Sequence, residues 1–180
     1  MTTPPDPGTA LRPSFAVRVA HLDGRWHCDL LAADADSELP VLEQALGEPG
    51  SPGEPGSPGW PGPLVIVVDS RLYFVVLRHG PGGMVRALIS DATFQEWLLA
   101  AEVVERYGIP VEAGNTIEDA FDDDEQGWPG GDLAVLADAG LPAEELTALL
   151  DSDEMWADEL VLAIAGRIGF ADELRAAATA

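Results

Sequence analysis

The side chains of this sequence best suited to holding a transition metal are its single cysteine and its histidines. His21, His27 and Cys28 fall in one short segment. A zinc site needs four protein ligands, or three and an open position, usually in tight C-x-x-C or H-x-x-x-H spacing. Neither spacing is present, and His27 and Cys28, as neighbours on a strand, must point to opposite faces. The sequence therefore predicts no metal site and no cofactor.

A hydrolase triad would have to combine Ser90, His79 and Asp91. No G-x-S-x-G turn frames a serine, and Ser90-Asp91 is more typical of the start of a helix. The glycines of residues 80–83 lie between two expected strands, which indicates a hairpin loop and not a phosphate-binding loop that opens a helix. None of the many carboxylates lies in a segment that looks buried, so a paired acid/base site has no support. We therefore predict that the protein is not an enzyme.

The elements that would position these residues centre on residues 64–91. This stretch contains three apolar runs rich in Val, Ile, Tyr and Phe, separated by turn residues, which predicts three consecutive strands. The runs 64–68 and 73–77 have no polar member, so both faces of these strands need cover.

Two further strands are expected before this stretch. Residues 14–20 alternate in a way that predicts a strand with one wet face, Asp23-Gly24 is a hairpin turn signal, and residues 25–31 return as a second strand. That second strand would place Trp26, Cys28 and Leu30 on one face. A short helix follows near 37–46, with Pro40 in its first turn.

A second helix is expected over 93–107. It would open with a Thr93/Glu96 capping box or with Asp91 as its cap. Its expected buried stripe contains five apolar side chains: Phe94, Trp97, Leu98, Ala101 and Val104.

Residues 132–178 read as short helices: one capped by Asp132 over 133–139, one from Pro142, one from Asp153 to Ile168, and one over 171–178. The fold class predicted is α+β, with a mainly antiparallel five-stranded sheet (β-β-α-β-β-β-α), helices on one face and a small C-terminal helical bundle. The second face of the central strands would be covered either by these C-terminal helices, which we favour, or by another subunit.

The domain organisation predicted has four parts. Residues 1–13 form a disordered tail, and residues 14–108 form an α+β domain with a Pro/Gly-rich insert at 47–63. Residues 109–131 are an acidic connector, and residues 132–178 form a C-terminal helical subdomain. Glycine at every third residue of the insert is typical of collagen, but the flanking strands favour an extended loop over a triple helix.

Charge sets limits on the partners. Nine basic residues against 32 acidic residues give a net charge of −23. Such a surface repels phosphate backbones, so we expect no direct binding of nucleic acid and no binding to an anionic membrane. A basic protein partner is the natural complement, and plain solubility is the alternative explanation.

The connector contains acidic residues interleaved with aromatic ones. Such a segment is either a docking segment that orders on binding or a solvated linker. The candidate partner-binding residues are Phe121, Asp122, Asp123, Asp124, Glu125 and Trp128.

We expect a cytoplasmic protein, with a monomer favoured. The single cysteine allows no internal disulfide, which suits a reducing compartment. The first residues have no apolar signal-peptide core, and no apolar run approaches the roughly 18 residues that a membrane-spanning helix needs.

Several segments together resemble one bacterial family, the tRNA adenosine deaminase-associated proteins. The residues that carry the resemblance are 72–77 (LYFVVL), 88–92 (LISDA), 131–133 with 136–140 (GDL and LADAG), and 169–174 (GFADEL). The Pro/Gly-rich insert departs from the family pattern. The resemblance implies association with the deaminase that converts adenosine to inosine in tRNA, and it implies no catalytic residues. The chain is not itself that deaminase, because the enzyme needs H-x-E and P-C-x-x-C to hold zinc.

The hypothesis for function is a non-catalytic, acidic accessory protein that acts in tRNA modification through protein contact, with the tRNA-modifying deaminase as its possible partner. Two alternatives remain open. One is an enzyme of unrecognised type, which would show a pocket of carboxylates or histidines with shifted pKa values. The other is an acidic nucleic-acid mimic that occupies a basic groove, which would need its carboxylates in a rigid stripe.

Overall fold

The computed structural model describes residues 10–32, 38–47, 63–94, 96–111, 128–152 and 154–179. Residues 1–9 of the expected tail, 48–62 of the insert and 112–127 of the connector lie outside the described residues. Within the described ranges, six strands form one antiparallel sheet in the order β2-β1-β3-β4-β5-β6. The strands are β1 (Phe15–Leu22), β2 (Arg25–Leu30), β3 (Leu64–Asp69), β4 (Tyr73–His79), β5 (Val85–Ile89) and β6 (Gly130–Gly131).

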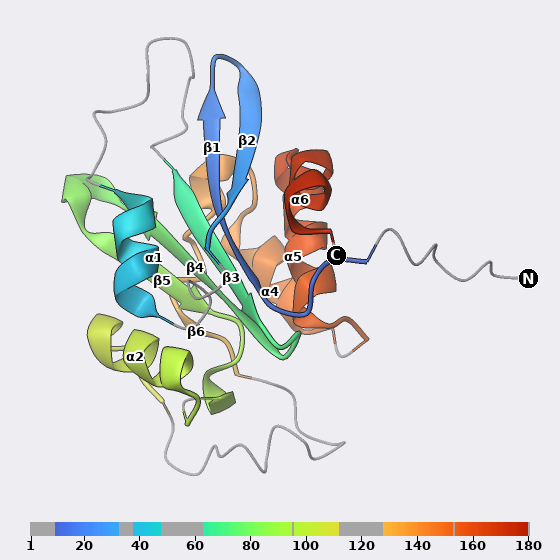
Figure 1. Ribbon diagram of the computed structural model, residues 1–180. Helices are drawn as coiled ribbons and strands as arrows, with labels where there is room; N and C mark the ends of the chain where they lie inside the picture. Colours follow the sequence, from blue (N-terminus) through green and yellow to red (C-terminus); the bar gives the residue numbers. More distant parts are fainter. Residues whose placement is uncertain are drawn as a thin grey trace, which may run out of the picture.

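The sheet lies between two layers of helices (Figure 1). The helices are α1 (Leu39–Leu46), α2 (Leu98–Tyr107), α4 (Ala143–Leu150), α5 (Ala157–Ile168) and α6 (Ala171–Ala178), and the short 3-10 turns are η1 (Pro81–Gly83), η2 (Ala92–Phe94) and η3 (Ala137–Ala139). Helices α1 and α2 cover one face, and α4, α5 and α6 cover the other. The predicted α+β class is confirmed, and the sheet has one short strand more than the five expected.

The two central strands are buried on both faces, as their sequence requires. Leu64, Ile66 and Val68 of β3 pack into the core under the C-terminal helices, whereas Val65 and Val67 pack under α1 and α2. β4 alternates in the same way. The second cover is therefore the C-terminal helical layer, which confirms the favoured alternative over a second subunit.

The β1–β2 hairpin forms where the Asp23-Gly24 signal places it. Both residues have positive φ, at 51° and 75°, and Leu22 pairs with Arg25 across the turn. The expectation of a wet face on β1 is wrong in part. Ala16 is buried in the core under α1 and Arg18 is half-buried, because the α1 side of the sheet extends over this strand.

The C-terminal layer docks on the β1–β2 hairpin through aromatic packing. The rings of Trp26 and Phe170 lie 5.5 Å apart, and Phe170 is fully buried. The amides of Gly169 and Phe170 both donate to the carbonyl of Ala165, at 2.7 and 2.9 Å, with Gly169 at a φ of 113°. This is the Schellman-type end expected for α5, and it turns the chain into α6.

The helix expected over 93–107 begins later, at Leu98. Asp91 does act as a cap, but its Oδ1 accepts the amide of Thr93 at 2.9 Å and holds a 3-10 turn. Phe94 and Trp97 therefore precede α2 and do not set the phase of its buried face. That face contains Leu99, Ala100 and Val103, whereas Leu98 is 67% exposed. The expected stripe is therefore wrong in part, although Val104 does pack against the same core.

The helix expected over 133–139 is a turn followed by η3. Arg78 at the end of β4 is fully buried and explains the difference. Its guanidinium donates to the carbonyl of Val135 at 2.8 Å and, in bidentate fashion, to Asp138 at 2.6 and 2.9 Å. These charge-assisted hydrogen bonds clamp the segment to the sheet and compete with the regular helix expected there.

Strand β6 depends on a close approach that only glycine permits. Gly131 has a φ of 91°, and a Cβ atom built there would overlap the carbonyl oxygen of Ala87. Gly140, which ends η3, has a similar φ of 101° but no atom within 4 Å of the same position. A comparison of substitutions at the two glycines therefore distinguishes the cost of backbone strain from the cost of steric overlap.

We predict that Gly131→Ala destabilises the protein more than Gly140→Ala. The control substitution should cost about 1 kcal/mol from left-handed backbone strain alone. Gly131→Ala adds the overlap with Ala87 and should cost roughly 3 kcal/mol or more. Urea unfolding of both variants measures the difference, and equal losses would show that β6 is not held against β5 by this approach.

We also predict that the C-terminal layer contributes much of the stability. Phe170→Ala removes a fully buried ring and should cost about 3–5 kcal/mol. Trp156→Ala is the matched control, because this indole is 55% exposed and its recorded ring contact is with the guanidinium of Arg71, worth about 1 kcal/mol. Similar melting temperatures for the two variants would contradict the assigned packing.

Candidate functional site

Of the six partner-binding residues proposed from the sequence, the structure describes Trp128 alone. Phe121, Asp122, Asp123, Asp124 and Glu125 lie outside the described residues, and their role stays a prediction. Trp128 is 48% exposed.

The backbone of Trp128 is fixed although much of its side chain is open to solvent. Its amide donates to Oδ1 of Asp91 at 3.2 Å, and its carbonyl accepts the amide of Ala92 at 2.7 Å. The same Asp91 oxygen also accepts the amide and the hydroxyl of Thr93, at 2.9 and 2.6 Å. Asp91 thus joins the start of η2 to the segment that leads into β6. These hydrogen bonds fix the backbone from which the Trp128 indole extends.

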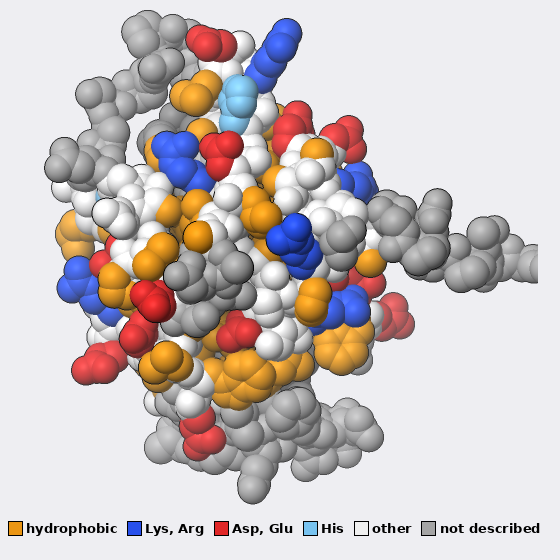
Figure 2. All heavy atoms as spheres, viewed as in Figure 1, with side chains coloured by type: hydrophobic (Ala, Val, Ile, Leu, Met, Phe, Trp, Pro, Cys, Tyr) orange, Lys and Arg blue, Asp and Glu red, His pale blue; other side chains and the backbone are white. Residues whose placement is uncertain are grey.

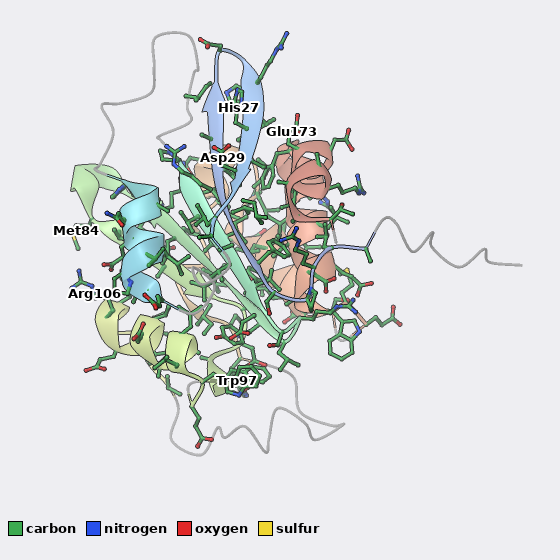
Figure 3. All side chains as sticks on the ribbon, in the orientation of Figure 1. His27, Asp29, Met84, Trp97, Arg106 and Glu173 are labelled. Atoms are coloured by element: carbon green, nitrogen blue, oxygen red, sulfur yellow. The ribbon has the colours of Figure 1, made fainter. Side chains whose placement is uncertain are left out.

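An aromatic stack includes Phe94 of η2, the turn to which the backbone of Trp128 is hydrogen-bonded. The rings of Tyr73 and Phe94 are stacked at 5.5 Å, and Trp97 meets Phe94 edge-on at 5.7 Å. Trp97 is half-buried, and Leu98 next to it is the more exposed residue. We call Trp97, Leu98 and Trp128 the η2 surface. The amide of Trp97 donates to Phe94 of η2, the carbonyl of Trp128 accepts from Ala92 of η2, and Leu98 follows Trp97 as the first residue of α2. Figure 3 shows Trp97 at one end of α2 and Arg106 at the other.

A groove of about 450 Å³ runs between α1 and α2. Its charged lining consists of Glu43, Glu102, Glu105 and Arg106. Arg106 Nε and the Tyr107 hydroxyl both donate to one oxygen of Glu43, at 3.0 and 2.7 Å. Three carboxylates against one guanidinium make this groove acidic.

The pKa of Glu43 moves away from the range useful for proton transfer at neutral pH. Burial opposes its ionisation, but the hydrogen bonds from Tyr107 and Arg106 outweigh burial and hold its pKa below the ordinary value. The pKa of Tyr107 is raised, first by burial and then by its hydrogen bond to Glu43. A general base works best with a pKa near the operating pH, so this pair reads as a contact that joins α1 to α2.

The residues considered for a triad are not brought together. Ser90 lies opposite Phe74 at the start of β4, where its hydroxyl accepts the Phe74 amide at 2.9 Å. His79 lies at the other end of β4, and its Nε2 donates to the carbonyl of Gly47 at 2.9 Å. Asp91 is occupied as the cap described above.

No group of three or more His, Cys, Asp or Glu side chains in the described part of the chain could hold a metal ion. His21 lies against Trp26, with ring centroids 4.6 Å apart, and Cys28 faces the C-terminal helices. Within the same ranges, none of the helices has the length and apolar character needed to cross a bilayer.

Carboxylates on the face of the molecule in Figure 2 are interspersed with basic and apolar side chains. A nucleic-acid mimic would need them in a continuous stripe.

The sequence could have revealed Asp91 and Trp128 as charged and aromatic candidates. It could not have revealed that one backbone turn joins them, nor that α1 and α2 form a groove.

The sequence matches the protein family described as "Rv3753c-like tRNA adenosine deaminase-associated protein" over residues 14–171. A relative, Protein Rv3753c of Mycobacterium tuberculosis strain H37Rv, is 34% identical over 163 residues, which cover 90% of this chain and 86% of the relative. No solved structure matches the chain.

We predict that the Cys28 thiol is unreactive at neutral pH. Burial, followed by the charges of Glu173 and Asp29, raises its pKa to about 12. Figure 3 shows these two carboxylates on the facing elements α6 and β2. The alkylation rate of the native protein with iodoacetamide should still be rising above a pH of about 10, whereas the urea-unfolded chain should level off above the ordinary thiol pKa of about 8.5. A native rate that levels off below a pH of about 9 would contradict this.

Proposed function

Because the chain belongs to the family of Rv3753c-like tRNA adenosine deaminase-associated proteins, we propose that it is a non-catalytic accessory protein that binds the tRNA adenosine deaminase by direct protein contact. The family match is the observation that carries this proposal. We place the interaction in the cytoplasm, since a chain with one cysteine suits a reducing compartment. We propose a monomer, because a net charge of −23 opposes self-association.

Charge supports contact with the enzyme and not with its RNA substrate. An enzyme that binds tRNA must carry Lys and Arg side chains to neutralise phosphates. A partner with 32 acidic residues against nine basic ones complements such a surface and is itself repelled by RNA. Opposite charges also steer the two proteins together at a rate that falls with added salt.

We propose that the η2 surface is part of the contact. Trp128 and Leu98 are large apolar side chains held on ordered backbone, and Trp is the residue type most enriched among those that dominate binding energy. The predicted docking residues 121–125 end three positions before Trp128 in the chain, so acidic and aromatic contacts would lie close together in sequence.

The test is binding of the purified deaminase to the full chain, measured by biolayer interferometry at about 50 mM and about 0.5 M salt. Binding should be detectable at low salt and weaker at high salt. Trp128→Ala should weaken binding about tenfold or more, because loss of a buried anchor costs ~1.4 kcal/mol or above. Trp156→Ala is the matched control and should change affinity by less than about twofold, since scattered surface contacts contribute little.

No binding at low salt would reject the proposal. A second arm adds tRNA to the complex. Retention of tRNA by the deaminase agrees with an accessory role, whereas stoichiometric release of tRNA would indicate the nucleic-acid mimic instead.

A further inference from the structure

Among the described residues, no strand pairs with the first half of β5 on the side away from β4. β6 pairs only with Leu88 and Ile89, and the amide of Asp132 adds one bond to the carbonyl of Ala87 at 2.8 Å. Beyond Asp132 the chain turns away into the segment clamped by Arg78. Val85 therefore lies past the end of β6.

The hydrogen-bond phase of β5 shows which of its backbone groups face outward. The Gly80 amide donates to the carbonyl of Met84 at 2.8 Å, and the Ser90 amide donates to the carbonyl of Phe74 at 2.9 Å. With the register of the two strands, this means that the even-numbered residues of β5 form the backbone hydrogen bonds to β4. In an antiparallel sheet the alternate residues then point to the other side. The N–H and C=O of Val85 thus face away from β4, and no strand among the described residues pairs with them.

A groove of about 660 Å³ lies beside this edge, between β5, the end of α2 and the segment after β6. Val85, Ile109 and Leu133 contribute apolar side chains to its lining. Arg86 and Asp132 are the charged members, and they form an ion pair with each other. Unlike the α1–α2 groove, this groove carries balanced charge, so it suits main-chain and apolar contacts more than a charged ligand.

We infer that this edge binds an extended, apolar segment of the deaminase as an added strand. The main chain of that segment bonds to the outward N–H and C=O of Val85, and an apolar side chain enters the groove. This is β-strand addition, in which an exposed edge supplies affinity and an adjacent pocket supplies selectivity. The inference rests on the proposed function, and it names the part of the partner that is recognised.

A second copy of this chain is a poorer occupant. Edge-to-edge pairing would bring two chains of net charge −23 together along a narrow contact. An apolar segment of a different protein does not meet this objection.

The experiment is residue-resolved amide hydrogen exchange of the full chain, alone and with the deaminase. The Val85 amide should exchange fast in the free protein and at least about tenfold more slowly in the complex, as an amide does when it gains a ladder hydrogen bond. The Arg86 amide, bonded to β4, should be slow in both states and serves as the internal control.

Two variants test the same edge by affinity. Val85→Pro removes the outward N–H without breaking a bond to β4, and proline is tolerated at such a position on the edge of a sheet. This variant should bind about tenfold more weakly. Val85→Ile keeps the N–H and should bind like the unaltered protein. Ala143→Trp fills the groove from α4, leaves β5 untouched and should also weaken binding, so the test survives if the proline variant fails to fold.

The outcomes separate the two proposals. Deaminase binding with unchanged Val85 exchange and unchanged affinity of the folded variants would overturn the edge site and leave the accessory role standing. A Val85 amide that is already slow in the free protein would show that the chain covers its own edge, and would also overturn it. No binding of the deaminase at all would overturn both.

Discussion

The architecture depends on one constraint, which is that β3 and β4 carry apolar side chains on both faces. Val65 and Val67 point one way, and Leu64, Ile66 and Val68 point the other, all almost fully buried. A sheet of this kind is stable only between two covers. The chain supplies α1 and α2 for one face and α4 to α6 for the other, and the turns, caps and clamps serve to bring these layers into place.

The local parts of this fold could be predicted because each is set by a few adjacent residues. Asp23-Gly24 makes the first hairpin, and Gly169 ends α5, through backbone conformations that these residues favour. The errors arise where a distant group competes with local propensity. Arg78 clamps the segment of Val135 and Asp138 to the sheet in place of the expected helix, and β6 consists of two glycines with no strand propensity of their own.

The candidate surfaces were harder to foresee than the fold. Trp128 could be singled out as an aromatic residue in an acidic segment, but the hydrogen bond from its amide to Asp91 joins positions 37 residues apart. That no described strand pairs with Val85 beyond β4 follows from where β6 stops, which no pattern within β5 reveals. The charge balance of the neighbouring groove likewise needs the pairing of Arg86 with Asp132, from segments far apart in sequence.

The contact between His79 and Gly47 has a consequence for how this gene can change. The His79 ring holds the Gly47 carbonyl at the end of β4, and Leu64, where β3 begins, pairs with Arg78 one residue away. Gly47 and Leu64 therefore both lie beside the same end of β4. Closing a longer loop between fixed neighbouring points costs only about 0.6 kcal/mol per doubling of its length. We therefore propose that codons can be gained or lost between positions 47 and 63, or a reporter domain inserted there, while the register of β3 with β4 stays unchanged.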